Sequence, residues 1–459
     1  MTHKKNQHES SECPIPRSEA PGLDTDLYQL TMMAAYIKSG KAGKTATFEL
    51  FVRSLPPGWG YLVACGVEGA LDFLEEVSFE DTQVDWLAGL DVFSGVDERV
   101  FDALRTFRFR GDVWAVPEGT PVFGEEPILR VTAPIEQAQI VETALLARVN
   151  YETLVATKGA RVVEAAQGRP VADFGSRRAH GTQAAFLAAR ASYVGGCSAT
   201  SNLAAGYRLG IPVSGTSAHA FIMAFEREMS AFEAFVETYP GGTALVVDTY
   251  DPLEGARHAA ELGGAVKAVR IDGGDLVQLS REVRELLDEG GAQEIKIFLS
   301  GDLDEHRIQS ILKDGAQADA FGVGTKLVTS WDHPALGGIY KLVEFDGRPV
   351  MKQGGEKATW PGGKQIYRTT DAHGFYTHDT VACAGEPAPG GEPLLEKVME
   401  GGERVRPHRQ VQEARKRWMR LGPKLPKSVR RFKAPAPYEV RWSQKIQETR
   451  RRLEEKAAQ

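Results

Sequence analysis

The sequence has few cysteines, no long apolar run and no excess of positive charge, and each absence excludes a class of protein. Its four cysteines, Cys13, Cys65, Cys197 and Cys383, are far apart and form no Cys-x-x-Cys pair, so neither a structural zinc site nor a disulfide framework is expected. This cysteine usage predicts a reducing, cytoplasmic location. No run approaches the ~20 apolar residues of a membrane-spanning helix. A net charge of −7 gives no reason to expect nucleic acid as a partner.

What is present is typical of a globular protein: 459 residues, 42% hydrophobic and 25% charged. This length can hold roughly two to three domains. Residues 1–21 are polar, lack the apolar core of a signal peptide and are predicted to be a disordered leader. We expect an α/β sandwich domain over 22–136, a catalytic α/β barrel over 137–345 and a C-terminal segment over 346–459 that returns to the first domain.

The first part of the chain mixes helix and strand patterns. Residues 26–38 predict a helix with Asp24 or Thr25 as N-cap. Residues 46–56 alternate apolar and polar side chains and predict a strand that ends at Pro56 and Pro57. Further helices are expected near 67–77, 80–90 and 98–107, and short strands over 112–134. Together these patterns predict an α+β domain.

After a long helical segment, roughly 137–167, short β-like runs alternate with helical stretches, as βα units do. The number of such runs is close to the eight of a (β/α) barrel, so we expect an incomplete barrel of about seven parallel strands. The runs are 170–176, 210–216, 243–251, 265–275, 294–302, 318–325 and 338–345.

Each of the first six runs changes from apolar to polar or small residues at its C-terminal end. In a parallel barrel these ends share one face, which carries the active site. Ordinary turn chemistry also favours Gly, Asp and Ser after a buried strand and accounts for Gly301 and Asp302. It does not account for a set of cations and a histidine, which turns do not select: Arg177, His219, Arg270 and Lys326.

His219 stands among small residues in the stretch 213–220, just after a predicted strand end. An open imidazole there can act as base, ligand or nucleophile. Taken alone, an isolated Ala-His-Ala is more often a partly buried core histidine. The polar strand ends around it favour the functional interpretation.

Aspartates and a glycine-rich turn complete the candidate site. Asp173, Asp248, Asp251, Asp272 and Asp275 follow predicted strands, beside the cations Arg177, Arg178, Arg270 and Lys326. Aspartates beside cations fit a Mg²⁺-diphosphate or sugar-diol ligand, although a helix N-cap is the ordinary role of such an aspartate. The Gly-rich stretch 321–325 precedes a helix and resembles a phosphate-binding turn. Tyr28, beside polar residues, could stack on a flat aromatic ligand.

Nine ordered motifs, from about residue 22 to the mid-430s, resemble nicotinate phosphoribosyltransferase. They are DLYQLTM (26–32), FELFVRSLP (48–56), NYETLVATKGARV (150–162), DFGSRRAHG (173–181), SGTSAHAF (214–221), VDTYD (247–251), VRIDGGDL (269–276), FGVGTKLVTS (321–330) and PGGKQIYR (361–368). The resemblance implies a type II phosphoribosyltransferase: an α/β sandwich joined to an incomplete α/β barrel, in a homodimer with shared active sites. It also implies transfer of phosphoribosyl from phosphoribosyl diphosphate (PRPP) to nicotinate, with Mg²⁺, coupled to ATP hydrolysis, in NAD biosynthesis.

The resemblance also implies a role for each matching residue. His219 would be phosphorylated by ATP, and Asp272 and Arg270 would complete the catalytic set, with Asp272 at the ribose hydroxyls. Tyr28 would stack on the nicotinate ring, which Arg177, Thr216 and Arg270 would also contact. Asp248 would lie near the diphosphate of PRPP, and Gly301, Gly324 and Thr325 would hold its 5′-phosphate. No direct protein ligand to the metal is implied.

Three alternatives stay open. The related nicotinamide enzyme carries an acidic residue whose counterpart, by this resemblance, falls near Thr200, Ser201 and Asn202, where this chain is neutral, and this favours the acid. A quinolinate enzyme needs a denser cationic pocket and is a shorter chain. A catalytically silent phosphate-binding paralogue is the third. The last 57 residues carry 18 Lys and Arg against 6 Asp and Glu, which by default is a solvated helix face, with anion or RNA binding as the alternative.

Overall fold

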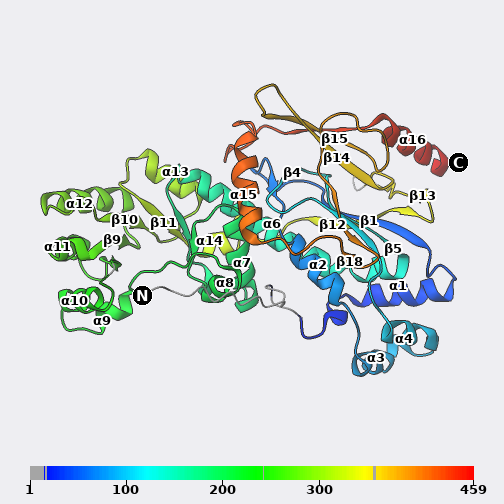
Figure 1. Cartoon of the computed structure of the whole chain (residues 1–459), viewed down its shortest axis with the longest axis horizontal. Coiled ribbons are helices and arrows are strands. Elements are labelled where there is room, and N and C mark those ends of the chain that lie inside the picture. Colours follow the sequence, from blue (N-terminus) through cyan, green and yellow to red (C-terminus); the bar gives the residue numbers. More distant parts are fainter. Residues whose placement is uncertain (1–14, 16–17, 241, 355–357, 459) are drawn as a thin grey trace.

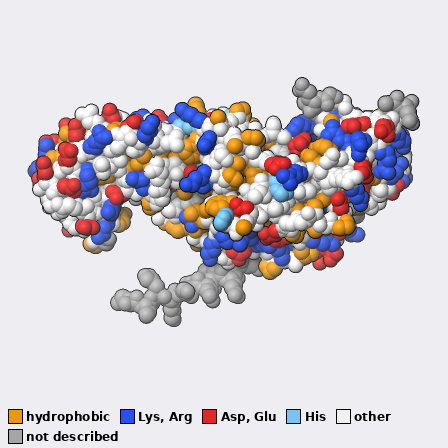
Figure 2. Space-filling model, turned by 90° about the horizontal axis from the view of Figure 1, so that it is seen from above, with side chains coloured by type: hydrophobic (Ala, Val, Ile, Leu, Met, Phe, Trp, Pro, Cys, Tyr) orange, Lys and Arg blue, Asp and Glu red, His pale blue; other side chains and the backbone are white. Residues whose placement is uncertain are grey.

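The computed structural model describes residues 15, 18–240, 242–354 and 358–458. The chain forms an elongated molecule with an open parallel sheet at one end and antiparallel sheets at the other (Figure 1). Most of the predicted leader lies outside the described residues. No described helix is both long and apolar enough to cross a membrane. On the face seen in Figure 2, acidic and basic side chains are interspersed and do not gather into one basic surface.

The antiparallel end is built on a sheet to which both ends of the sequence contribute. In the described part of the chain it has seven strands, in the order β13-β12-β1-β5-β3-β17-β18. Their bounds are β1 (Thr45–Val52), β3 (Asp112–Ala115), β5 (Pro127–Pro134), β12 (Gly338–Phe345), β13 (Arg348–Pro349), β17 (Glu396–Glu400) and β18 (Glu403–Arg404). Strand β17 pairs with β3, so the C-terminal region does return to the N-terminal sheet.

The prediction that residues 338–345 form a barrel strand is wrong. This segment is β12, and it pairs antiparallel with β1, with Leu50 opposite Tyr340. A parallel neighbour in the barrel needs a crossover helix. Between the last barrel strand and β12 the described chain has only the four-residue helix α14 (Thr325–Val328) and turns.

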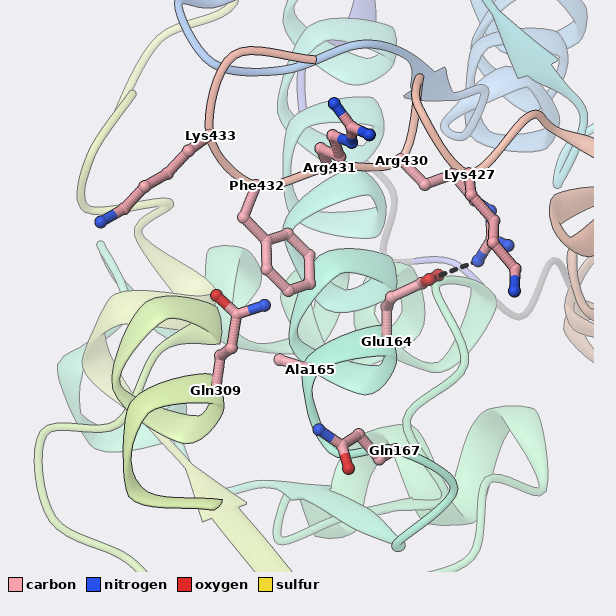
Figure 3. A pocket seen from close by; sticks show the side chains of 9 residues that line it. All are labelled: Glu164, Ala165, Gln167, Gln309, Lys427, Arg430, Arg431, Phe432 and Lys433. Atoms are coloured by element: carbon pink, nitrogen blue, oxygen red, sulfur yellow. Dashed lines mark hydrogen bonds and ion pairs between the residues drawn. The ribbon is translucent and has the colours of Figure 1, made fainter. Parts of the chain in front are cut away.

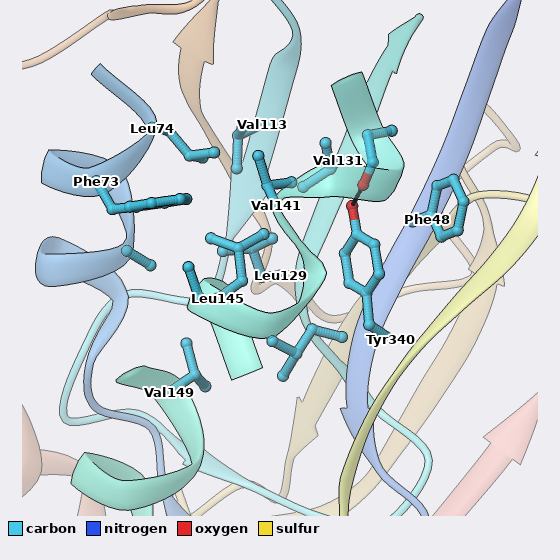
Figure 4. Close-up of a cluster of buried hydrophobic side chains, with 14 of the residues drawn as sticks. Phe48, Phe73, Leu74, Val113, Leu129, Val131, Val141, Leu145, Val149 and Tyr340 are labelled. Carbon is cyan, nitrogen blue, oxygen red and sulfur yellow. Dashed lines mark hydrogen bonds between the residues drawn. The ribbon is translucent and has the colours of Figure 1, made fainter. Parts of the chain in front are cut away.

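Helices and the buried face of this sheet form the core of the sandwich. The helices are α1 (Leu27–Lys38), α2 (Val67–Glu76), α3 (Asp81–Ala88), α4 (Glu98–Arg105), α5 (Ile135–Ile140) and α6 (Glu142–Ala165), in agreement with the predicted helical segments. The N-cap of α1 is Asp26, not Asp24 or Thr25. Figure 4 shows Phe48 beside Tyr340, whose rings stack at 4.8 Å, and Leu129 beside Leu145 on α6. The Tyr340 hydroxyl donates to the Ala138 carbonyl over 2.9 Å, so even this buried polar atom is satisfied.

The C-terminal region adds a second small sheet and two helices. Within the described residues this sheet has the order β16-β14-β15-β19. The elements are β14 (Lys364–Thr370), β15 (Tyr376–Cys383), β16 (Glu392–Pro393), β19 (Glu439–Trp442), α15 (Val411–Leu421) and α16 (Gln444–Ala458). Part of the basic segment is not solvated: Arg404, only 9% exposed, pairs with Glu68 and Asp72 of α2. The helix predicted at the end of the chain is α16.

The other end of the molecule is the incomplete barrel. Among the described residues it is a sheet of six parallel strands in the order β7-β6-β11-β10-β9-β8, flanked by helices such as α11 (Pro252–Leu262), α12 (Leu276–Glu289) and α13 (Glu305–Lys313) (Figure 1). The strands are β6 (Val171–Asp173), β7 (Ala199–Thr200), β8 (Thr243–Val246), β9 (Val266–Ile271), β10 (Lys296–Leu299) and β11 (Ala320–Val323). Their centres are fully buried, for example Val269, Ile297 and Phe321, as strands covered on both faces must be. In the described structure the predicted run 210–216 contributes only a bridge from Val213 to Thr200.

Candidate active site

A cavity of about 250 Å³ opens where the parallel strands end. It gathers six predicted site residues from four different strand ends: Arg177, Arg270, Asp272, Gly301, Gly324 and Thr325. The wall also contains Phe174, Arg178, Ser300, Asp302, Leu303, Gly322 and Lys326. Because carboxyl ends of parallel strands meet at one edge, segments up to about 150 residues apart reach one cavity.

Asp272 lies at the centre of a hydrogen-bonded cluster. Arg270 donates to its Oδ1 over 2.6 Å, and the Ser300 hydroxyl donates to the same oxygen over 2.6 Å. Burial alone raises the pKa of Asp272, but the hydrogen bond from Ser300 and the charge of Arg270 outweigh it and lower that pKa below its usual value. Asp272 is therefore ionised at neutral pH. The backbone N–H of Asp272 donates to Asp248 Oδ2 over 2.6 Å, which attaches the loop after β8 to the loop after β9.

Arg270 is fixed on all sides. Its Nε donates to the Ser300 hydroxyl over 2.7 Å, and another guanidinium nitrogen donates to the Thr216 hydroxyl over 3.1 Å. Its guanidinium carbon lies 5.6 Å from the centre of the Phe174 ring. The side chain is only 13% exposed, so the guanidinium faces the cavity in one orientation. Such preorganised cations stabilise negative charge that develops in a reaction.

His219 lies beside this cluster as the first residue of α9 (His219–Met223). Its Nδ1 lies 3.1 Å from the Thr249 hydroxyl, and its Nε2 lies 3.7 Å from Asp272 Oδ2. The side chain is 39% exposed, so it is not a core histidine. The loop before it is held by Ser217, whose hydroxyl accepts from the Val246 N–H over 2.9 Å. One ring nitrogen is oriented while the other faces an anion and solvent.

Gly301 has a structural requirement for glycine. Its φ of 94° lies in the left-handed region, and a Cβ at this position would lie 2.0 Å from the backbone oxygen of Asp272. Only glycine allows the loop after β10 to approach the loop after β9 this closely. Lys326, from the short helix α14 after β11, pairs with Asp304 over 2.9 Å at the cavity edge.

Three of the predicted aspartates have structural roles. Asp251 and Asp275 cap the N-termini of α11 and α12 by accepting backbone N–H groups. Asp173 is fully buried and accepts from the Gly175 N–H and the Thr200 hydroxyl, and burial raises its pKa. Asp248 and Asp272 are the aspartates that remain for chemistry. No three carboxylate, His or Cys side chains of the described residues converge as a metal-binding group.

Among the predicted site residues, His219, Thr216 and Asp248 contact the residues that line the cavity, whereas Tyr28 lies far from it. It lies on α1, in the sandwich, at the end of the molecule away from the parallel sheet (Figure 1). The side chain is 47% exposed. Burial of part of the ring and the nearby Glu142 raise its pKa to about 12, so the hydroxyl is neutral.

Sequence reasoning missed Ser300 and Thr249 as site residues. Both stand inside segments that were singled out, but small hydroxyl residues at strand ends are also ordinary turn residues. The Ser300 hydroxyl joins Arg270 to Asp272, and the Thr249 hydroxyl orients His219. The available signal was position: Ser300 comes directly after a buried apolar run, and Thr249 follows another such run with one residue between.

A second hollow, of about 420 Å³, lies apart from the strand ends. Figure 3 shows Phe432 pointing toward the space between Gln309 and Ala165, with Arg430 paired to Glu164. Its cations come from the basic C-terminal segment and none of the predicted site residues lines it. The strand-end cavity is therefore the candidate active site, although it is the smaller of the two.

An incomplete parallel barrel with a cationic cavity at its strand ends, joined to an antiparallel sandwich, defines a class: the type II phosphoribosyltransferases. Residues 23–150 match the nicotinate phosphoribosyltransferase (NAPRTase) N-terminal domain, residues 390–450 the nicotinate phosphoribosyltransferase C-terminal domain, and residues 155–333 the quinolinate phosphoribosyl transferase C-terminal domain. The chain is 45% identical to nicotinate phosphoribosyltransferase pncB2 of Mycobacterium tuberculosis over 88% of its length and 87% of the relative's.

Solved structures agree. The crystal structure of human nicotinic acid phosphoribosyltransferase superposes with a TM-score of 0.84 at 28% identity, covering 94% of this chain and 99% of that chain. Nicotinate-nucleotide pyrophosphorylase from Pyrococcus furiosus gives a TM-score of 0.74 at 29% identity, covering 89% and 97%. The chain belongs to the nicotinate phosphoribosyltransferase family.

Proposed function

We propose that the protein transfers phosphoribosyl from PRPP to nicotinate, giving nicotinate mononucleotide and diphosphate, and that this transfer is coupled to ATP hydrolysis through His219. The observation that carries the proposal is the convergence of Arg270, Asp272 and His219 on one rim beside Gly301. The relatives named as nicotinate phosphoribosyltransferases support the choice of substrate and the place in NAD biosynthesis.

The transfer breaks the bond between ribose C1 and a diphosphate oxygen, and forms a bond between C1 and the pyridine nitrogen. Positive charge develops on the sugar and negative charge on the leaving diphosphate. Asp272, ionised and rigidly held, lies where it can bond the ribose hydroxyls and stabilise the sugar. Arg270 and Lys326 offer positive charge to the phosphate groups, and the loops at Gly301, Gly324 and Thr325 enclose the 5′-phosphate.

Asp248 is the residue that would hold Mg²⁺ in this site. Asp248 Oδ1 is buried and has no hydrogen-bond partner within the described residues, while Oδ2 accepts from the Asp272 N–H. A free carboxylate oxygen is the kind of ligand Mg²⁺ takes, together with phosphate oxygens and water. When bound with diphosphate, Mg²⁺ supplies charge that stabilises the leaving group.

The base site selects an acid. Arg177 is exposed at the cavity edge and can bond a carboxylate, and Thr216 lies next to Arg270. In the loop after β7, Asn202 is neutral and donates to the Ser176 hydroxyl over 3.1 Å. A carboxylate there would repel nicotinate, so the neutral residue favours the acid over the amide.

We further propose a homodimer in which Tyr28 of one copy stacks on the nicotinate held by the other. In the described chain, Tyr28 is remote from the cavity, so the base site lacks its aromatic wall without a second copy. Large apolar side chains are exposed on the barrel part, at 75% for Leu203, 65% for Met223 and 66% for Trp331. In the proposed dimer the second copy would cover these exposed apolar groups.

In the coupled reaction, a ring nitrogen of His219 attacks the γ-phosphorus of ATP, and ADP leaves. Water later hydrolyses the phosphohistidine and releases inorganic phosphate. Exposure of the imidazole and its contact with Thr249 support this role. The described cysteines are free thiols, which fits the proposed reducing cytoplasm.

A panel of bases tests the proposal. Nicotinate, nicotinamide and quinolinate are each incubated with PRPP and Mg²⁺, with and without ATP, and the products are identified by mass. The proposal requires nicotinate mononucleotide as the main product, stimulated by ATP. It also requires acid-labile phosphate on the protein that is lost in His219→Ala. A main product from another base, or full ATP coupling in His219→Ala, would overturn the corresponding part.

A further inference from the structure

A fully buried cluster of charges lies on α6, outside the cavity. Lys158 and Arg161, one turn apart and each 2% exposed, both bind the Glu305 carboxylate, which is 0% exposed. Lys158 Nζ lies 2.7 Å from Glu305 Oε2, and Arg161 Nε lies 2.8 Å from Glu305 Oε1. Lys158 Nζ also lies 2.5 Å from Asp332 Oδ1. No step of the proposed reaction uses these groups directly.

The two carboxylates that Lys158 holds follow the two loops proposed to enclose the 5′-phosphate, which are the loops after β10 and β11; we call these the phosphate loops. Glu305 is the first residue of α13 and follows directly on the loop that begins at Gly301. Asp332 follows the short helix α14, which begins at Thr325. The Lys158 ammonium group therefore joins the loop after β10 to the loop after β11.

The same two loops are joined a second time at the cavity edge. Lys326, next to Thr325, pairs with Asp304, next to Glu305. The pKa of Asp304 is lower than usual. Burial raises this pKa, but a backbone hydrogen bond from Arg307, the ion pair with Lys326 and the positive charge of Lys158 together lower it. The charge of Lys326, which lines the cavity, is thus positioned by a network that has Lys158 at its base.

Stability alone does not account for this cluster. Removing charged groups from water is costly, and apolar residues of similar volume often stabilise a protein as well or better. What the buried charges add is a defined geometry, because Lys158 Nζ pairs with both Glu305 and Asp332 while Arg161 donates to Glu305 and to the Gly58 carbonyl. The geometry that they define is the separation of the two phosphate loops.

We propose that Lys158 is a positioning residue for the phosphate end of PRPP: it holds the loops after β10 and β11 at the spacing that a 5′-phosphate requires. This inference rests on the proposed function. Lys158 does not touch the substrate, and it acts through Glu305, Asp332 and the Asp304–Lys326 pair. Its loss weakens phosphate binding and leaves the base site intact.

Lys158→Met keeps a long, unbranched side chain, one atom shorter, and removes its charge. The control is Lys364→Met, because Lys364 is 3% exposed and lies 2.7 Å from Glu49 Oε2, so it is an equally buried Lys–Glu pair, but in the sandwich. Calorimetry measures the Kd of ribose 5-phosphate, and kinetics measure KM for PRPP and for nicotinate. We expect Lys158→Met to raise Kd and the KM for PRPP about tenfold, with KM for nicotinate unchanged, and Lys364→Met to change none of them.

Equal effects of Lys158→Met and Lys364→Met, or a KM for nicotinate that rises as much as that for PRPP, would overturn the proposal. Should Lys158→Met fail to fold, Asp332→Asn serves as the second variant, since its side chain is 31% exposed and only one end of the network is altered. It is expected to weaken ribose 5-phosphate binding about threefold, and no change would count against the proposal. Because ribose 5-phosphate binding needs no turnover, a failure of the proposed nicotinate reaction is recognised separately.

Discussion

The Ser300 hydroxyl donates to Asp272 Oδ1 over 2.6 Å while it accepts from Arg270 Nε over 2.7 Å. Ser300 is 2% exposed in the cavity wall, so its hydroxyl is surrounded mainly by protein groups. This one hydroxyl therefore fixes the relative positions of the carboxylate and the guanidinium that face the substrate.

Ser300→Ala is expected to lower kcat/KM about 10- to 100-fold. Loss of a hydrogen bond to a charged group costs about 1.5–3 kcal/mol, and each 1.4 kcal/mol is tenfold. The measurement is steady-state kinetics with PRPP as the varied substrate. Ser310→Ala, which removes a hydroxyl from the outer helix α13, is the control and should be silent. An unchanged kcat/KM in Ser300→Ala would show that Arg270 alone positions Asp272.

The acid limb of the pH–rate profile should move to higher pH in Ser300→Ala. The pKa of Asp272 is lower in the folded protein than in the unfolded chain, where it is about 3.9. Its carboxylate therefore stabilises the fold fully above that unfolded value. The contribution is lost as the pH falls through the lower pKa of the folded protein. Without the Ser300 hydrogen bond the pKa of Asp272 rises, and protonation begins at higher pH. Profiles of kcat/KM from about pH 3 to 7 compare the two proteins, so that the low wild-type limb lies within the range. A limb that stays in place would show that another group sets it.

The sequence predicts the barrel well where strands are buried on both faces, because continuous apolar runs such as 294–299 then stand out. Strand β7 was not predicted because two residues carry no pattern. The run 338–345 was recognised as a strand but given to the wrong sheet, since alternation does not say which neighbour a strand pairs with. Nothing in the sequence distinguishes Lys158 and Arg161 from solvated helix residues. Only the folded chain shows that both pair with Glu305 of α13.

Gly301→Ala is expected to destabilise the protein by about 1–3 kcal/mol, because alanine is strained at this φ and its Cβ clashes with the Asp272 carbonyl. Binding of ribose 5-phosphate should weaken as well, since the loops after β9 and β10 must separate. Thermal unfolding and calorimetry measure the two effects. Gly264→Ala is the matched control: in the described structure no other atom lies within 4 Å of its Cβ position. Equal stability of the two variants would show that the loop yields without cost.

Tyr28 and Arg270 lie in different parts of one chain, so a shared active site predicts that defects in them complement each other. Tyr28→Ala and Arg270→Ala are each expected to have low activity as homodimers, because every site then lacks one of the two side chains. In a mixed dimer, both substitutions fall in one site and the other site is intact.

Random reassortment of equal amounts of the two variants places one intact site in half of the dimers, so activity should recover to about one quarter of the wild-type value. The two proteins are dissociated, mixed and reassociated, and each variant treated alone in the same way is the control. Activity that stays at the level of the separate variants, although mixed dimers are detected by mass, would show that Tyr28 does not serve the site of a second copy.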